Sequence, residues 1–254
     1  MNVKCETFDQ GTITSQRINT LLDGHSNLSY LEIGVDQGST FNSVRLDLKI
    51  GVDPSPSPLM SNDRRIRRCE SDTYFADLDR DDGDFDVIFI DGLHTADQLL
   101  KDLVNSIVRL KSGGIIILDD VYPDSRPSMC RSIFRYRMLR IFDRLRTTRR
   151  AAVGWQGDVC RAIPFLQEIA PILKYFTVVS GGEKLQTFVY LAGRIDTQAL
   201  DHERIFKEFK RAKHGQKLDF YGRQPSSKSE VPDYFRPVSW EEALDILASR
   251  EPIL

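Results

Sequence analysis

Four short apolar runs in the first 120 residues, each followed at once by glycine or an acidic residue, constrain the fold of this chain most. The runs occupy residues 29–33, 48–52, 85–90 and 115–118. Their apolar residues do not alternate cleanly with polar ones, which is typical of strands covered on both faces. We therefore predict buried strands at these four positions.

The segment between the last two runs has a helical period. Its apolar residues Leu99, Leu103, Ile107 and Leu110 recur at spacings of four, four and three, which place them on one helix face. Residues 111–114 (Lys-Ser-Gly-Gly) then act as a predicted helix stop. Strand–helix–strand repetition predicts an α/β fold with a doubly wound, mostly parallel sheet and right-handed crossovers.

The domain organisation follows from where this pattern ends. The 254 residues, 41% of them hydrophobic, suit one large domain with an appendage. We expect residues 1–200 to form that domain, with two closing strands at 175–179 and 188–191 and a basic helical insert at about 124–152. Residues 201–254 are predicted to be a helical C-terminal extension that packs against the core instead of covering the site.

Charge, hydropathy and cysteine usage exclude several classes of protein. The net charge of −2 argues against a dedicated nucleic-acid-binding protein. No apolar run reaches the roughly 18 residues that a transmembrane helix needs, and residues 1–10 lack the apolar region of a signal peptide. The four cysteines form no C-x-x-C pair. The expectation is a cytoplasmic protein with reduced thiols.

Acidic side chains gather at the ends of the predicted strands. They are Glu32, Asp53, Asp91, Asp119 and Asp120. Ligands of open α/β sheets bind beyond the carboxyl ends of the strands, so these residues are candidates for a binding site. Any one of them alone has a structural alternative, the capping of a following helix.

The turn after the first strand narrows the ligand. It reads Glu32-x-Gly34-x-x-x-Gly38, which is neither the G-x-G-x-x-G of NAD proteins nor a P-loop. This pattern favours a nucleoside without a pyrophosphate. Asp53, at the end of the second strand, is placed to bind both hydroxyls of a ribose. An NAD-dependent oxidoreductase is disfavoured because the glycine motif is missing and Pro54 follows the ribose-binding acid.

The predicted strands and the residues at their ends resemble those of a class I S-adenosylmethionine-dependent methyltransferase with a seven-stranded Rossmann-like sheet. More closely, they are similar to a bacterial branch of small-molecule and sugar O-methyltransferases of the family 24 type. The resemblance covers about residues 28–192 and is carried by 31–39, 51–54, 89–94, 101–102, 113–117 and the W-x-G-D-V element at 155–159.

The resemblance implies a cofactor site for S-adenosyl-L-methionine. Gly34 and Gly38 would line its methionine and ribose portions, and Asp91 would approach its methionine end. The full set implied is Glu32, Gly34, Gly38, Ser39, Asp53, Ser71, Asp72 and Asp91. A sulfonium cation is favoured by nearby carboxylates, so the acidic strand ends suit this ligand.

Methyl transfer to a hydroxyl group also needs a base. His94 lies three residues beyond Asp91, just past a strand end, and imidazole titrates near neutral pH. We predict His94 as the general base, with helix capping as the alternative. Asp91 and, by resemblance alone, Asp158 complete the candidate catalytic residues.

A metal-assisted mechanism is the alternative to base catalysis alone. Catechol-type O-methyltransferases carry an Asp, a basic residue and an Asp-Asn pair where this chain has Asp91, His94 and Asp119-Asp120. Asp91, Asp119 and Asp120 are therefore candidate ligands for Mg²⁺, which would orient the substrate oxygen and lower its pKa. Otherwise one of these acids caps a helix and the others face water.

The insert is strongly basic. Residues 126–150 contain nine arginines and one acid, Asp143, and Phe134, Met138, Ile141 and Leu145 recur at helical spacing. An amphipathic basic helix is predicted, with an anionic acceptor, a membrane surface or water facing it.

The sequence thus favours a methyltransferase that methylates a hydroxyl of a small molecule or glycan, and the arginines favour an anionic acceptor. The competing hypothesis is a non-catalytic methyltransferase-like module that docks through the arginine-rich helix on an anionic membrane or nucleic acid.

Overall fold

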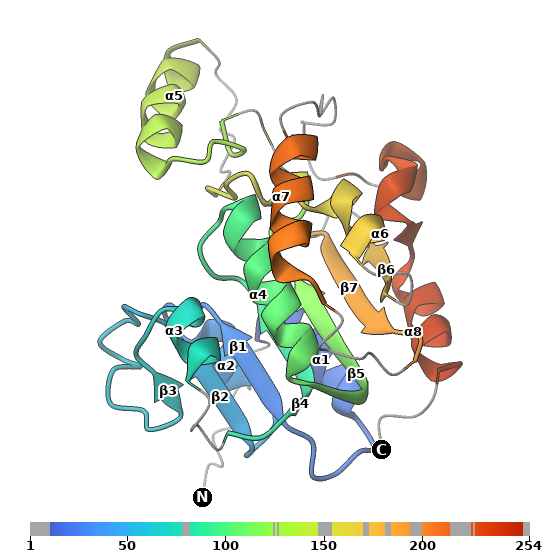
Figure 1. Ribbon diagram of the computed structural model, residues 1–254. Coiled ribbons are helices and arrows are strands. Elements are labelled where there is room, and N and C mark those ends of the chain that lie inside the picture. Colours follow the sequence, from blue (N-terminus) through green and yellow to red (C-terminus); the bar gives the residue numbers. More distant parts are fainter. Residues whose placement is uncertain are drawn as a thin grey trace, which may run out of the picture.

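The predicted strands are neighbours in one eight-stranded sheet in the computed structural model (Figure 1). The structure describes residues 11–77, 82–123, 125, 127–146, 154–169, 173–180, 184–193, 200–213, 225 and 227–250, with the backbone alone at 142–146 and 213. The strands are β1 (Tyr30–Ile33), β2 (Lys49–Val52), β3 (Ile66–Arg67), β4 (Phe85–Ile90), β5 (Leu110–Leu118), β6 (Leu173–Val178), β7 (Gln186–Leu191) and β8 (Pro237–Val238).

The order across the sheet is β3-β2-β1-β4-β5-β7-β6-β8, and β7 alone of these strands runs against the others. The α/β, doubly wound and mostly parallel fold class is therefore confirmed. The predicted number of seven strands was one too low, because β8 adds a short strand from the C-terminal extension beside β6. A two-residue strand carries too little periodic signal to be found in the sequence.

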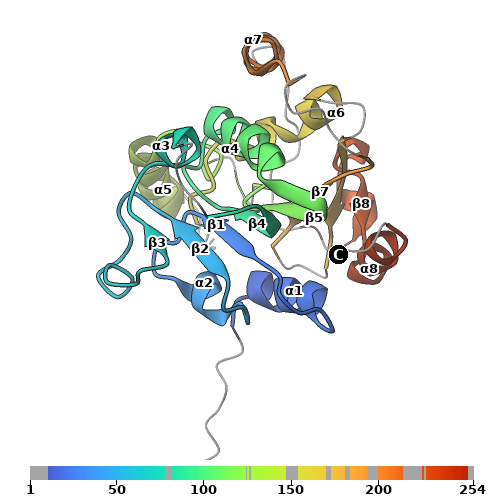
Figure 2. The same ribbon diagram turned by 60° about the horizontal axis from the view of Figure 1, so that its bottom comes forward.

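Helices cover both faces of the sheet (Figure 2). One apolar cluster joins α3, α4, α6 and α7 to the sheet, and a second joins α1, α2 and α8 to the opposite face. Helix α5 stands apart from both layers (Figure 1). The helices are α1 (Ile13–Leu22), α2 (Ser39–Ser43), α3 (Ser71–Ala76), α4 (Ala96–Val108), α5 (Ile133–Arg146), α6 (Leu166–Ile169), α7 (His202–Lys213) and α8 (Trp240–Ala248).

Strand β4 shows why the apolar runs do not alternate. Its residues are all buried. Val87 and Phe89 belong to the cluster with α1 and α2, whereas Ile88 and Ile90 belong to the cluster with α3 and α4. Successive side chains of a strand point to opposite faces, so a sheet with helices on both faces needs apolar residues at every position.

The predicted end of the fourth helix was wrong. Helix α4 ends at Val108, and residues 110–114 are part of β5 instead of a helix stop. Leu110 pairs with Phe85 in the sheet, with an irregularity in register before Val87. A side chain at Gly114 would lie 2.9 Å from the Asp86 carbonyl oxygen, so this glycine allows β5 to pass close to β4.

The C-terminal extension contributes to the core, as expected. Phe235 and Ala243 are fully buried, each in one of the two clusters. Helix α8 begins with a capping box, in which Ser239 and Glu242 each accept a hydrogen bond from the other's backbone N–H. The division of domains at residue 200 stays a prediction. Within the described ranges, no helix has the length and apolar character to cross a bilayer.

Candidate active site

A cavity of about 640 Å³ opens at the carboxyl ends of β1, β2 and β4. This volume is typical of sites for small molecules. The predicted site residues that line it are Glu32, Gly34, Ser39, Asp53, Ser71, Asp72, Asp91 and His94. The remaining predicted site residues are Gly38, Asp119, Asp120 and Asp158, which the structure describes and which do not line this cavity.

The two glycines of the first turn serve different purposes. Gly34 has φ +87°, and a Cβ there would lie 2.1 Å from the carbonyl oxygen of Asp91. It therefore lets the end of β1 pass against the loop after β4. Gly38 has φ +76° and precedes α2, and its Cβ would meet the Met60 side chain at 2.4 Å, behind the cavity wall. Both positions need the left-handed backbone that glycine adopts readily.

Asp53 holds the glycine turn in place. One oxygen of its carboxylate accepts hydrogen bonds from the backbone N–H groups of Val35 (3.0 Å) and Asp36 (2.8 Å). The other accepts from the N–H of Ser55 at 2.7 Å. The same carboxylate lines the cavity, where a bound ligand could contact it, and its role toward ribose hydroxyls stays a prediction.

The far wall of the cavity contains a residue that the sequence analysis missed. The Gln98 amide in α4 donates to the Ser71 hydroxyl (3.1 Å) and to the Asp72 carboxylate (2.7 Å). Lys101 also binds Asp72, at 2.6 Å. Gln98 lies one helical turn before residues 101–102, which carry part of the family resemblance. This spacing was the sequence signal that could have indicated Gln98 as a cavity residue.

Glu32 is a buried acid at the end of β1. It accepts a hydrogen bond from the Tyr30 hydroxyl at 2.6 Å, and its side chain is almost fully enclosed. Burial raises the pKa of Glu32 to about 8, although the bond from Tyr30 opposes this shift. Glu32 is therefore largely protonated at neutral pH.

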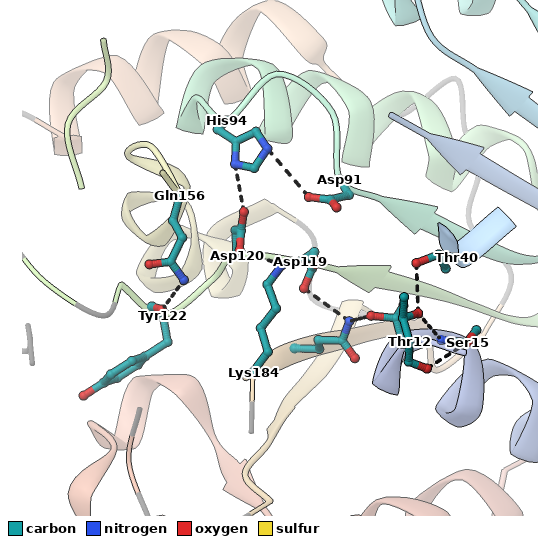
Figure 3. Close-up of polar contacts among 12 residues, drawn as sticks. Thr12, Ser15, Thr40, Asp91, His94, Asp119, Asp120, Tyr122, Gln156 and Lys184 are labelled. Carbon is teal, nitrogen blue, oxygen red and sulfur yellow. Dashed lines mark hydrogen bonds and ion pairs between the residues drawn. The ribbon is translucent and has the colours of Figure 1, made fainter. Parts of the chain in front are cut away.

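His94 lies between two carboxylates (Figure 3). Its Nδ1 is 2.8 Å from Asp120 Oδ2, and its Nε2 is 3.8 Å from Asp91 Oδ1. Asp120 has φ +53°, a left-handed backbone conformation that costs free energy in a residue other than glycine. The fold thus holds one nitrogen of His94 against a carboxylate and leaves the other near the cavity.

Lys184, two residues before β7, neutralises the acids at the end of β5. Its Nζ is 2.7 Å from Asp119 and 2.8 Å from Asp120. Burial alone would raise the pKa of Asp120, but the bond with His94 and the charge of Lys184 hold it below its usual range. Burial and the charge of Asp119 raise the pKa of Asp91 well above its usual range. Lys184 was not predicted, because it lies 65 residues after Asp119 in the sequence.

The W-x-G-D-V element packs on the His94 loop. The Trp155 ring stacks on the imidazole with centroids 5.1 Å apart. A Cβ at Gly157 would lie 1.6 Å from the His94 carbonyl oxygen, so only glycine fits there. Asp158 accepts a hydrogen bond from the Ala96 N–H at 3.0 Å, at the start of α4. These contacts favour a structural role for Asp158 over the catalytic role expected from the sequence.

Comparison with known families decides the class of this fold. Residues 31–121, which include β1 to β5, match the family model described as methyltransferase domain. Residues 31–121 are thus similar to a methyltransferase domain. This match agrees with the resemblance stated from the sequence and supports the enzyme class that it implies.

Solved structures with similar folds include three O-methyltransferase or methyltransferase complexes. An O-methyltransferase from Bacillus cereus in complex with SAH is 16% identical over 74% of this chain and 82% of that chain, with a TM-score of 0.44. TomG from Streptomyces achromogenes with SAM is 13% identical (71% and 76% covered, TM-score 0.41), and MycE with Mg and SAH is 16% identical (72% and 49%, 0.42). Such values do not decide the function. No curated protein matches the sequence.

The structure brings together part of the predicted metal site. Ligand atoms of Asp91, His94 and Asp120 lie within 4.8 Å of one another, beside a hollow of about 10 Å³. Asp119 does not join them, because it binds Lys184 and the Gln186 amide (3.2 Å) instead. Two carboxylates and one imidazole fit a divalent cation in part, since Mg²⁺ prefers oxygen ligands.

Proposed function

We propose that this methyltransferase methylates a hydroxyl group of a small molecule or a glycan, with His94 as the general base. The observation that carries the proposal is the position of His94. It lines the cavity, and its Nδ1 lies against the Asp120 carboxylate. This contact favours the tautomer with the proton on Nδ1, which leaves the Nε2 lone pair free to accept a proton from the acceptor.

S-adenosylmethionine, when bound, supplies an activated methyl group on a sulfonium sulfur. The cavity residues suit such a ligand, because Gly34 keeps a side chain out of the turn and six acidic residues line the space. We assign Asp53 to the ribose hydroxyls, Ser71 and Asp72 to the adenine side, and Asp91 to the methionine end. Glu32, Gly34, Ser39 and, through the shape of the turn, Gly38 complete the cofactor site.

The chain's own residues would then direct the transfer. Trp155 would restrain the His94 ring by stacking, and the nearby charge of Asp120 would favour the proton on Nδ1. His94 Nε2 would take the proton of the acceptor hydroxyl, whose oxygen would receive the methyl group that the bound cofactor supplies. Asp120 stabilises the imidazolium that results, so the charge stays balanced in the site.

The cofactor half of this proposal is tested by calorimetric titration with S-adenosylhomocysteine. Asp53→Ala should abolish binding, because it removes both the ribose acceptor and the bonds that hold the glycine turn. Asp47→Ala is the matched control: it removes an exposed acid at the opposite end of the same strand. Absence of heat with the wild-type protein would overturn the proposal.

The base is tested by transfer of labelled methyl groups to a mixture of simple phenols and hexosides, with products identified by mass spectrometry. His94→Asn should lower the rate by about 10²–10⁴-fold, the usual contribution of a general base. S-adenosylhomocysteine binding should be unchanged. His25→Asn, at an exposed position after α1, is the control. A His94→Asn enzyme of normal rate would remove the base from the mechanism.

A second candidate is a divalent cation held by Asp91, His94 and Asp120, supported by the closeness of their ligand atoms. The cation would lower the pKa of the acceptor hydroxyl. The two roles exclude each other, because a metal-bound nitrogen of His94 cannot accept the proton. Calorimetric titration with Mg²⁺ of wild-type and Asp120→Asn protein distinguishes them: heat lost in the variant favours the cation. The cytoplasmic location expected from the sequence stays a prediction.

A further inference from the structure

Helix α5 presents two different faces. Tyr136 is buried, and the Arg140 guanidinium donates to its hydroxyl at 3.0 Å and lies 5.5 Å above its ring. This side of the helix is therefore turned toward the protein. Figure 1 shows α5 beyond the end of the sheet near which α4 begins, outside the two helical layers.

The side of α5 away from Tyr136 is an exposed apolar stripe. Phe134, Met138 and Ile141 follow one another at spacings of four and three, so they share one helix face, about opposite to Tyr136. Their exposed fractions are 69%, 42% and 55%. Large apolar side chains in water are unfavourable, and a contiguous stripe of them indicates a surface that is covered in function.

Arginines flank the apolar stripe. Arg135 and Arg137 are exposed, and at 100° per residue they lie on either side of the line through Phe134 and Ile141. The segment 126–150 has a net charge of +8, whereas the rest of the chain has −10. The stripe is therefore surrounded by positive charge on an otherwise acidic molecule.

We propose that α5 lies on the surface of an anionic phospholipid bilayer, with the apolar stripe inserted among the acyl chains and the arginines on the headgroups. This occupant satisfies both features of the helix, since interfacial helices combine apolar burial with attraction to anionic lipids. The phosphates of a nucleic acid would pair with the arginines but would leave the apolar stripe exposed to water.

A second copy of the chain fits the helix less well. Pairing of two α5 stripes would bring Arg135 and Arg137 of both copies together, and like charges repel. Helix α5 also exposes Ile133 and Leu139, and outside α5 the exposed large apolar residues in the described part of the chain are Leu48, Leu59, Leu93 and Val108, which lie on no common element.

Docking through α5 would bring the active site close to the lipid. Arg131, just before the helix, binds Asp97 at the start of α4. The Trp155 indole donates to the Cys130 carbonyl while its ring stacks on His94. The chain leading into α5 is thus tied to the same loop that holds His94. An acceptor presented at a membrane surface would suit this arrangement.

The test is flotation of the full-length protein with vesicles of pure phosphatidylcholine or of equal parts phosphatidylcholine and phosphatidylglycerol. The wild-type protein should float with the mixed vesicles and not with the neutral ones. Phe134→Ser/Ile141→Ser should lower the partition coefficient at least about tenfold, because two buried apolar side chains are lost. Leu48→Ser/Leu59→Ser removes equally exposed apolar groups elsewhere and should have no effect.

Charge is tested separately from apolar contact. Arg135→Gln/Arg137→Gln should also weaken binding to the mixed vesicles, and added salt should weaken wild-type binding. S-adenosylhomocysteine binding by each variant shows that it is folded, and it separates this proposal from the catalytic one. Failure to bind mixed vesicles, or equal binding by the stripe variant, would overturn the proposal. So would sedimentation of a dimer that the stripe variant loses, without vesicle binding.

Discussion

The two walls of the active-site cavity are built in different ways. The wall at β1 and β2 is made from backbone: Gly34 allows a close chain approach, and Asp53 binds backbone N–H groups of the turn. The wall at β4 and β5 is held from behind by charged side chains: Asp120 contacts both His94, which lines the cavity, and Lys184. The structure of the first wall is maintained by steric fit, whereas that of the second is maintained by the balance of positive and negative charge.

This difference has a functional meaning. A backbone wall offers fixed shape and fixed donors, which suits a ligand that never varies, such as a methyl donor. A wall of side chains from separate segments can move protons and can be altered without rebuilding the sheet. We therefore expect mutations in the first wall to affect binding and folding together, and mutations in the second to affect stability through electrostatics and the rate through His94.

The largest effect on stability is expected at Gly34. Gly34→Ala places a Cβ 2.1 Å from the Asp91 carbonyl oxygen, an unyielding backbone atom, at φ +87°. The free energy of unfolding should fall by about 3 kcal/mol or more, and S-adenosylhomocysteine binding should be lost.

Gly38→Ala is the matched comparison in the same turn. Its backbone strain is similar, but the Cβ would meet the flexible Met60 side chain. The loss should be only about 1–2 kcal/mol in urea unfolding, with binding retained. If both variants lose the same free energy, the backbone wall does not depend on the close approach at Gly34.

The same contrast explains what the sequence could predict. The backbone wall follows from local signals: apolar runs, glycines and acids adjoin one another along the chain, and a family model matches the segment that contains them. His94 was predicted because it is near a strand end. Lys184 and the stacking of Trp155 were not, because tertiary packing brings distant segments together and nothing in their local sequence records it. The end of α4 was misplaced because two glycines imitate a helix stop within β5.

The second prediction concerns the charged wall. Lys184→Met leaves Asp119 and Asp120, both buried, without their ammonium partner. Breaking a buried pair costs about 3–5 kcal/mol, but about a third of the lysine side chain is exposed (36%), so a loss nearer 2 kcal/mol is expected at pH 7. The pKa of Asp120 is held low in the folded protein, so the stability it contributes is present at neutral pH.

That stability is lost as the pH falls through the low folded pKa of Asp120, since protonation ends its pairing. The gap between wild type and Lys184→Met should therefore narrow in acid, as measured by urea unfolding at several pH values. Lys184→Met/Asp119→Asn removes one of the two orphaned charges and should recover part of the loss. A double variant no more stable than the single one would show that charge is not what Lys184 supplies.

The smallest effect, counted per pH unit, is expected at Glu32, a buried acid of β1. Burial raises its pKa to about 8 in the folded protein, above the value of an exposed glutamate. The folded state therefore holds a proton that the unfolded state has released between these two values. Stability is fully present below the unfolded pKa, near 4.3, and falls as the pH rises through about 8, by at most about 1.4 kcal/mol per pH unit.

Glu32→Gln should flatten this slope, because the amide has no proton to lose. Burial also raises the pKa of Asp102 to about 6, which adds a slope of the same sign to the stability curves of both wild type and Glu32→Gln. The test is therefore the difference between the two curves. Parallel curves would mean that Glu32 is ionised in the folded protein. The cavity would then hold a further negative charge beside the sulfonium of the methyl donor, and the backbone wall would act electrostatically as well as sterically.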